Sequence, residues 1–378
     1  MKKIYWRPQS TPLFAFVLIA LFSLAGIMAV ERFRVEEKRP SYQKKIEASR
    51  LALEAMELIK DERMRRGLSI DSETDPAGSG LIGSFVTPVT TDAGDLDAKQ
   101  TAINPNFAAV AVELLRETNV KEGDPVAVSF SGSFPALNIA VYAAIRVLHL
   151  RPTIISSVSS SQWGANEPEF LWLDMEHCLQ DRGLFPFRST AASLGGRLDR
   201  GREMTEKSRR IALDAVERNG LTLIRTKTLH EDIDERMAIY FREDAPKAYI
   251  NVGGGRAAAG PRPFKVLLKP GLLASDLPEI VRGDYLIARF LKEGIPVIQF
   301  YDVKRLARHY GLPIAPTAMP EVGQGRIYYG THYNKWLAAM VLFVIVAGLF
   351  VFSRSDWGFR MLQVSSRREE MGPPEPMV

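Results

Sequence analysis

The sequence predicts an α/β protein with a mainly parallel sheet, helices on both faces of that sheet, and two flanking transmembrane helices. Two observations support this fold class. An uncharged apolar run lies near each end of the chain, at residues 11–30 and 336–352. Between these runs, short apolar segments with the length of buried strands alternate with longer segments of helical periodicity. Such alternation is typical of parallel strands joined by crossover helices.

Both apolar runs are long enough to be interpreted as membrane spans. The first, Thr11–Val30, covers roughly 30 Å as a helix, the thickness of the hydrocarbon core. The second, Trp336–Phe352, is bordered by aromatic residues of the kind that lie at membrane interfaces. Two alternatives stay open: a signal peptide cleaved near Ala29 for the first run, and a buried core helix for the second.

The short segments outside the two runs are basic, and they set the predicted orientation. A large domain is translocated largely regardless of its charge, so only these flanks count. Their basic residues are Lys2, Lys3, Arg7, Arg354, Arg360, Arg367 and Arg368. We therefore expect a two-pass protein of the cytoplasmic (inner) membrane with both termini cytoplasmic and the large domain extracytoplasmic. The predicted parts are a cytoplasmic N-terminus (1–10), a transmembrane helix (11–30), a stalk helix (31–68), an extracytoplasmic α/β domain (69–334), a second transmembrane helix (335–353) and a cytoplasmic tail (354–378).

Charge, cysteine and histidine content exclude several classes of function. The chain has 49 Lys and Arg and 44 Asp and Glu, of which eight and four lie outside residues 31–334. The remaining 41 and 40 leave this region nearly neutral, so we expect no nucleic-acid partner. The single Cys178 and five scattered histidines fit neither a disulfide framework nor a clustered metal site. We predict neither a metal nor a cofactor.

The region between the two runs has a regular order of predicted elements. Residues 41–67 have apolar side chains at helical spacing and predict a stalk or packing helix. Residues 69–97, rich in Gly, Ser, Thr, Pro and Asp, predict a long functional loop. The predicted strands are 125–130, 153–158, 248–252 and 296–300. The predicted helices are 107–120, 136–150, 167–181, 203–219, 232–242, 284–293 and 303–310.

Three polar segments follow predicted strands, where open α/β sheets bind their ligands. The first contains Ser131, Gly132 and Ser133, at a tight turn between a strand and a helix. A serine here is a candidate nucleophile, a candidate anion donor, or a simple helix cap. The segment lacks the G-x-S-x-G spacing of a nucleophile elbow.

The second segment is the serine-rich exit from the next strand, with Ser159, Ser160, Ser161 and the aromatic Trp163. One interpretation is a polar ligand-binding rim, with Asp174 and His177 on the following helix as proton-transfer candidates. The other interpretation is structural: Asn166 caps that helix, Glu167 and Pro168 form its first turn, and Trp163 packs beside it.

The third segment is Gly253, Gly254, Gly255 and Arg256, which follows another apolar strand. Three glycines allow backbone N–H groups to turn toward an anion, and Arg256 adds a positive charge. The segment fits neither G-x-G-x-x-G nor the phosphate loop, which argues against a nucleotide enzyme. We predict that it converges with Ser131 and Ser133 at one sheet edge. The Gly/Arg/Asp loop 194–201 is a further candidate for this rim, with a tight turn as its default interpretation.

Five segments together resemble the bacterial poly-gamma-glutamate system protein family. They are GDLDAKQTAINPNFAA (94–109), VSFSGSFPALNIA (128–140), SSSQWGANEPEFLWLDME (159–176), ASLGGRLDRG (192–201) and INVGGGRAAAG (250–260). The resemblance covers most of the outer domain and the two-anchor layout. It implies association with poly-γ-glutamate capsule synthesis or export, together with ligase and other membrane subunits as partners. It implies no catalytic residue.

Two functions from different classes follow from these observations. The first is an accessory membrane protein of polymer synthesis and export, whose outer domain binds the anionic polymer or a partner subunit. The second is an extracytoplasmic serine-dependent hydrolase of the polymer, which requires Ser131 or Ser133 to lie within hydrogen-bond reach of Asp174 or His177.

Overall fold

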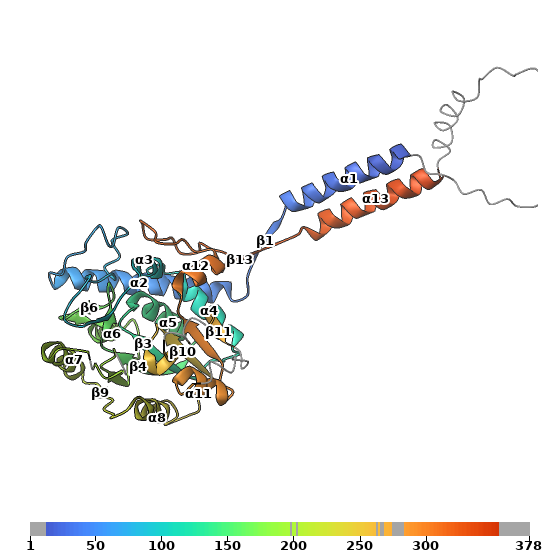
Figure 1. Cartoon of the computed structure of the whole chain (residues 1–378). Coiled ribbons are helices and arrows are strands. Elements are labelled where there is room, and N and C mark those ends of the chain that lie inside the picture. Colours follow the sequence, from blue (N-terminus) through green and yellow to red (C-terminus); the bar gives the residue numbers. More distant parts are fainter. Residues whose placement is uncertain are drawn as a thin grey trace, which may run out of the picture. The chain divides into compact units, whose positions relative to one another are not determined.

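The computed structural model describes residues 13–354, except 197–198, 202, 262–263, 265–267 and 274–282 (Figure 1). The side chains of residues 13–16 and 352–354 are also outside the described part. The chain divides into two units, residues 1–37 with 329–378 (unit 1) and residues 38–328 (unit 2). The predicted cytoplasmic segments 1–10 and 355–378 lie outside the described residues.

Unit 1 contains two long apolar helices that pack against each other, α1 (Leu13–Arg32) and α13 (Lys335–Arg354). They coincide closely with the two predicted membrane spans. Strands β1 (Val35–Lys38) and β13 (Tyr329–His332) pair beside them. Over the residues that the structure describes, no helix is both long and apolar enough to cross a membrane. The transmembrane role of α1 and α13 therefore stays a prediction.

Unit 2 is built around a seven-stranded sheet in which neighbouring strands are parallel except for one edge pair. The strand order is β11 (Gly271–Leu273), β12 (Val297–Phe300), β10 (Ala248–Val252), β3 (Pro125–Ser131), β4 (Arg151–Ser157), β8 (Ala191–Ser193) and β9 (Thr222–Leu223). Only β11 runs antiparallel to its neighbour. The mainly parallel α/β sheet predicted from the sequence is thus confirmed.

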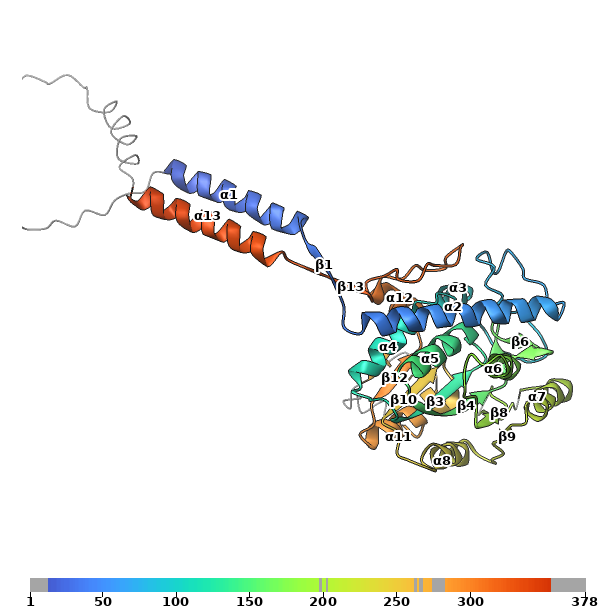
Figure 2. The ribbon, with the colours of Figure 1, turned by 180° about the vertical axis from the view of Figure 1, so that it is seen from behind.

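Helices cover both faces of this sheet (Figures 1 and 2). One face carries α4 (Phe107–Glu117), α5 (Pro135–Val147) and α6 (Trp172–Asp181). The other carries α8 (Leu229–Tyr240), α9 (Arg256–Ala259) and α11 (Leu286–Lys292). Helix α7 (Glu206–Arg218) packs against α6, and α3 (Leu96–Ala102) packs against α12 (Val303–Tyr310).

Alternate side chains of the central strands form the two halves of the core. Tyr249 and its register partners Ala127 and Val297 face α8 and α11, where Tyr249 stacks on Phe290 at 4.2 Å between ring centroids. Ile250 and its neighbours on the opposite face are also buried. Burial on both faces explains why most residues of these strands are apolar in the sequence.

Helix α2 (Tyr42–Arg65) covers most of the segment predicted as a stalk or packing helix. It belongs to unit 2 and packs on α4 and α5. Its side chains Ala48, Ala52, Ala55 and Ile59 are completely buried. The packing interpretation therefore describes this helix.

The predicted cap of α6 is wrong. The expected helix 167–181 begins only at Trp172, because Asn166–Glu167 (β6) and Phe170–Leu171 (β7) form a short antiparallel hairpin. The Asn166 side chain instead holds the long loop: it accepts from Ser84 N at 3.0 Å and donates to Thr90 Oγ1 at 3.0 Å. The loop residues Thr90–Asp92 (β2) also pair with Ser160–Ser161 (β5). The loop thus lies against the exit of β4.

Candidate functional site

The strand order places the turns after β3 and β10 side by side. Strand β3 has β4, β8 and β9 on one side and β10 and β12 on the other, so the direction of strand addition reverses between β3 and β10. In open α/β sheets the carboxyl edge at this point is where ligands bind. Strands β3 and β10 are parallel and pair Ser129 with Asn251. The turns after them therefore leave the same edge of the sheet.

The glycine turn after β10 approaches the serine turn after β3 closely. A Cβ atom on Gly253 would lie 3.0 Å from Ser131 Cβ, and Gly253 has φ +96°, so this position requires glycine. Arg256 follows at the start of α9 and is exposed. Helix α9 has only four residues, so its dipole adds little to an anion site. The predicted proximity of the two turns is present, while ligand binding by Gly254, Gly255 and Arg256 stays a prediction.

The serine turn after β3 has an ordered hydrogen-bond pattern. Ser133 N donates to Ser131 Oγ at 3.2 Å, and Asn138 Nδ2 of α5 donates to the Ser131 carbonyl at 3.0 Å. Pro135 occupies the first turn of α5, where its missing N–H has no cost. Ser131 and Ser133 are each half-buried at this edge of the sheet.

The exit from β4 packs directly on this serine turn. Ser161 N donates to Ser133 Oγ at 3.0 Å, and Ala165 N donates to the Gly132 carbonyl at 2.8 Å. A Cβ on Gly164 would lie 2.8 Å from the Gly132 oxygen. Ser159 and Ser160 are 3% and 1% exposed, so they line the interior of the turn and only Ser161 is half-open to solvent.

Trp163 adopts a backbone conformation that is unusual for a non-glycine residue, with φ +58°. Its ring packs on Phe85 of the long loop, with centroids 5.2 Å apart. Its indole Nε1 is buried and, within the described part of the chain, has no hydrogen-bond partner. Strained residues of this kind cluster at functional sites.

Sequence reasoning missed an ammonium group that contacts the serine turn, that of Lys99 on α3. Its Nζ donates to the Ser133 carbonyl and to Ser161 Oγ, the latter at 2.8 Å, and lies 4.0 Å from the centroid of the Phe134 ring. Lys99 lies within the segment GDLDAKQT, where nothing in the spacing of apolar residues predicts that this lysine is buried. In the structure, Lys99 is only 4% exposed. Burial lowers the pKa of Lys99 to about 7, and Asp95 opposes this shift.

A second buried lysine shows what is unusual about Lys99. Lys45 is fully buried, but its Nζ forms an ion pair with Glu113 at 2.6 Å. Among the residues described, no carboxylate forms an ion pair with Lys99, and its nitrogen contacts a carbonyl, a hydroxyl and an aromatic ring. A buried charge without a counter-ion is costly, so the neutral amine is favoured.

Asp174 and His177 lie elsewhere and have other partners. Asp174 accepts from Arg218 at 2.6 Å and from the Leu171 N–H at 2.8 Å, so it caps α6 and anchors α7. His177 Nδ1 is 2.9 Å from Arg188. Both line a pocket of about 560 Å³ with residues of α2 and α7. Neither contacts Ser131 or Ser133, so the serine, histidine and aspartate arrangement required by the hydrolase hypothesis is not assembled.

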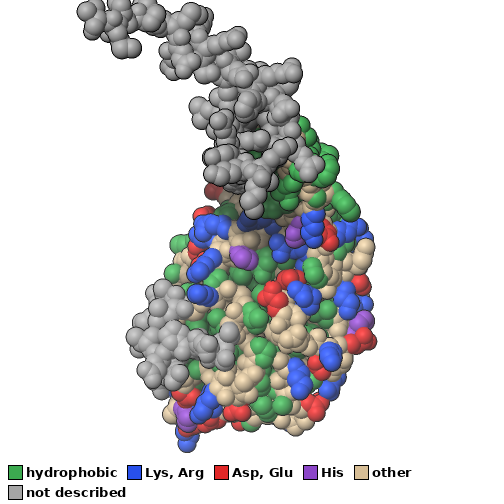
Figure 3. All heavy atoms as spheres, turned by 90° about the vertical axis from the view of Figure 1, so that its right-hand side faces the viewer, with side chains coloured by type: hydrophobic (Ala, Val, Ile, Leu, Met, Phe, Trp, Pro, Cys, Tyr) green, Lys and Arg blue, Asp and Glu red, His purple; other side chains and the backbone are tan. Residues whose placement is uncertain are grey.

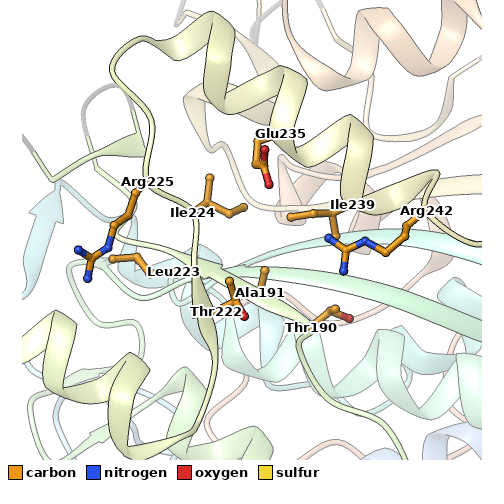
Figure 4. A pocket seen from close by; sticks show the side chains of 9 residues that line it. All are labelled: Thr190, Ala191, Thr222, Leu223, Ile224, Arg225, Glu235, Ile239 and Arg242. Carbon is orange, nitrogen blue, oxygen red and sulfur yellow. The ribbon is translucent and has the colours of Figure 1, made fainter.

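A second pocket, of about 290 Å³, lies between β8, β9 and α8 (Figure 4). Thr190, Leu223 and Glu235 line this pocket, and Arg225 and Arg242 lie on opposite sides of it. It contains none of the predicted site residues. In the part of the chain that the structure describes, no group of three His, Cys, Asp or Glu side chains is placed to hold a metal ion.

Two further groups of ionisable side chains are buried in unit 2. Arg236 of α8 pairs with Asp232 at 2.8 Å and with Asp199 of the 194–201 loop, so that loop is held against α8. Arg197 of the same loop lies outside the described residues. Burial raises the pKa of Glu176 to about 7, and its carboxylate accepts from Tyr142 at 2.7 Å. Glu176 Oε2 also accepts from Ser189, whereas its Oε1 is buried and has no hydrogen-bond partner among the described residues.

Figure 3 shows one face of unit 2, on which Lys and Arg side chains are interspersed with Asp and Glu side chains. The strand order defines a doubly wound α/β protein whose strand-end edge carries serine and glycine turns, with Arg256 beside them. Comparisons with protein-family models, with curated proteins and with solved structures find no match.

Proposed function

We propose that this chain is an accessory membrane protein of poly-γ-glutamate capsule synthesis or export, and that unit 2 binds the anionic polymer at the edge between β3 and β10. One observation carries the binding proposal: the turns 131–133 and 253–256 meet at the point where strand addition reverses. Glycine turns and hydroxyl groups suit carboxylates, and Arg256 supplies a charge-assisted hydrogen bond.

The apolar surface of unit 1 supports membrane anchoring. Helices α1 and α13 pack together, yet large apolar side chains remain exposed on both, including Met28 at 65% and Phe343 at 72%. Trp336 at the start of α13 is 88% exposed. Such a surface is unfavourable in water and favourable in lipid, with the aromatic residue at an interface. We place unit 2 outside the cytoplasmic membrane, with both termini cytoplasmic.

The assignment to the capsule system rests on the family resemblance of the five motifs. Two of these motifs form the proposed edge itself, VSFSGSFPALNIA and INVGGGRAAAG. The partners implied are synthase and export membrane subunits. The nearly equal numbers of basic and acidic residues in 31–334 give no support for a nucleic-acid partner.

Calorimetry with γ-glutamate oligomers tests the binding proposal on the full chain in detergent. Arg256→Ala is expected to weaken binding roughly 10- to 100-fold, the cost of a charge-assisted hydrogen bond. Arg256→Lys also weakens it, because lysine does not reproduce a bidentate contact. Arg210→Ala is the matched control, since Arg210 lies on the surface of α7 and pairs only with Glu206. Undiminished binding by Arg256→Ala refutes this site.

Reporter fusions test the topology. A cytoplasmic reporter is expected to be active when fused after residue 378 and inactive near residue 200. The opposite pattern would overturn the proposed orientation.

The role in the capsule system is tested in a deletion strain. Loss of this protein is expected to lower or mislocalise surface polymer while ligase activity persists in extracts. A capsule of normal amount and location would contradict an accessory role.

A further inference from the structure

The side chains of Lys99 and Ser161 contact each other beside the serine turn 131–133. Their contact joins α3 to the exit of β4, with 2.8 Å between Lys99 Nζ and Ser161 Oγ. The lysine is almost fully buried, whereas the serine is half-exposed at the strand-end edge. Ser161 is therefore the solvent-facing member of the pair, and the lysine is shielded from water.

The surroundings of the lysine nitrogen suit a neutral amine. In the protonated form, Lys99 Nζ donates to both the Ser133 carbonyl and Ser161 Oγ. Loss of one proton leaves a lone pair that accepts the hydroxyl proton of Ser161, so the amine keeps both partners without a positive charge. The Phe134 ring shields the nitrogen on another side. The nearby charged groups are Asp95 at the start of α3 and Lys304 of α12, which pair with each other at 2.7 Å, and Asp97. None of these three forms an ion pair with Lys99.

We propose that Lys99 and Ser161 form a serine/lysine catalytic pair that cleaves amide bonds by acyl transfer. Lys99 is the general base and Ser161 is the nucleophile. Ser133 Oγ accepts from the Ser161 N–H at 3.0 Å, so its own hydroxyl proton is available to the oxygen of a carbonyl bound at Ser161.

The reaction balances with water as the only co-reactant. Ser161 Oγ attacks the amide carbonyl and its proton passes to Lys99 Nζ. The C–N bond then breaks as that proton moves to the leaving nitrogen, which departs as an amine and leaves an ester on Ser161. Water attacks the ester, gives a proton to Lys99, and the C–O bond to Ser161 breaks as the proton returns to the serine oxygen.

The substrate class follows from the position of the pair. Ser133 connects Ser161 directly to the serine turn that faces Gly253. When an amide bond is bound at Ser161, carboxylates on the adjoining residues of the substrate would lie at the proposed anion edge. This choice of a glutamyl amide rests on the proposed function, whereas the nucleophile itself does not.

Labelling of the full chain in detergent with a fluorophosphonate probe tests the nucleophile independently of the polymer. Intact mass and peptide mapping are expected to place one phosphonyl group on Ser161, and Ser161→Ala abolishes the labelling. Lys99→Arg abolishes it as well, because a guanidinium group keeps a charge and a donor but does not act as a base near neutral pH. Ser84→Ala, a half-buried serine of the long loop, is the matched control and labels normally.

The pH profile of wild-type labelling separates catalysis from structure. With the pKa of Lys99 at about 7, the neutral fraction and hence the labelling rate rise about tenfold between pH 6 and 8. Labelling of another serine, no labelling of the wild type at pH 8, or a flat profile overturns the catalytic pair. The pH profile of the wild type tests the catalytic pair even if the Lys99→Arg variant fails to fold.

Chain-length analysis of γ-glutamate oligomers tests the substrate. Labelling at Ser161 together with oligomer cleavage by wild type, but not by Ser161→Ala, supports both parts of the inference. Labelling at Ser161 without cleavage overturns the glutamyl substrate and keeps the serine/lysine pair. Binding that depends on Arg256 without any labelling overturns the pair and leaves the proposed function in place.

Discussion

Lys99 alone is expected to make the folded chain about 2 kcal/mol more stable at pH 9 than at pH 7. Burial lowers the pKa of this ammonium group from 10.5 to about 7. Between pH 7 and 9 the unfolded chain keeps the proton while the folded chain releases it, so the free energy of unfolding rises with pH. A difference of one bound proton between the unfolded and folded chains changes the free energy of unfolding by about 1.36 kcal/mol per pH unit. This difference grows from about half a proton at pH 7 to about one proton at pH 9.

Urea denaturation of the full chain in detergent micelles at pH 7, 8 and 9 measures this effect, with tryptophan fluorescence as the signal. The pH range ends at 9 because above this pH the buried tyrosines lower the free energy of unfolding as pH rises. Burial raises the pKa of Tyr142 and Tyr249 far above the usual value, so these groups keep their protons in the folded chain while the unfolded chain loses them. Lys99→Met is expected to remove the rise, whereas Lys304→Met, on a partly exposed lysine, keeps it. An equal rise in Lys99→Met refutes the assignment of a buried, mostly neutral lysine.

Three further changes test the packing around the site. Gly164→Ala is expected to lower the free energy of unfolding by about 1 to 3 kcal/mol, since the added methyl group overlaps the turn after β3, and an unchanged melting temperature would contradict this. Glu113→Gln is expected to cost about 3 to 5 kcal/mol in urea denaturation, because it leaves the Lys45 charge buried without its partner. Asn166→Ala removes the side chain that holds Ser84 and is expected to speed amide hydrogen exchange at residues 84–90; exchange as slow as in the wild type would show that the loop is held by other contacts.

The strands were predictable because most of their consecutive residues are apolar, as buried strands require. Residues 248–252 and 296–300 are apolar except for Asn251 and Gln299, and in the structure β10 occupies the first range and β12 the last four residues of the second. The start of α6 was not predictable in the same way. Asn166 has the chemistry of a helix cap, but its amide group bonds to Ser84 and Thr90, about eighty positions earlier in the chain. A local pattern contains no information about such a distant partner.

By itself the sequence determined the α/β class, the two apolar end segments, and the serine and glycine turns that follow strands β3, β4 and β10. These features depend on periodicity and composition over a few neighbouring residues, which act wherever the segment lies. The tertiary structure decided which of these turns meet. It placed Asp174 and His177 with Arg218 and Arg188, away from the serine turns. It also brought Lys99 to Ser161 across 62 positions of the chain. The physical reason is that strand order and the path of the long loop, rather than local preference, determine which side chains share one water-excluding site and therefore which pKa values change.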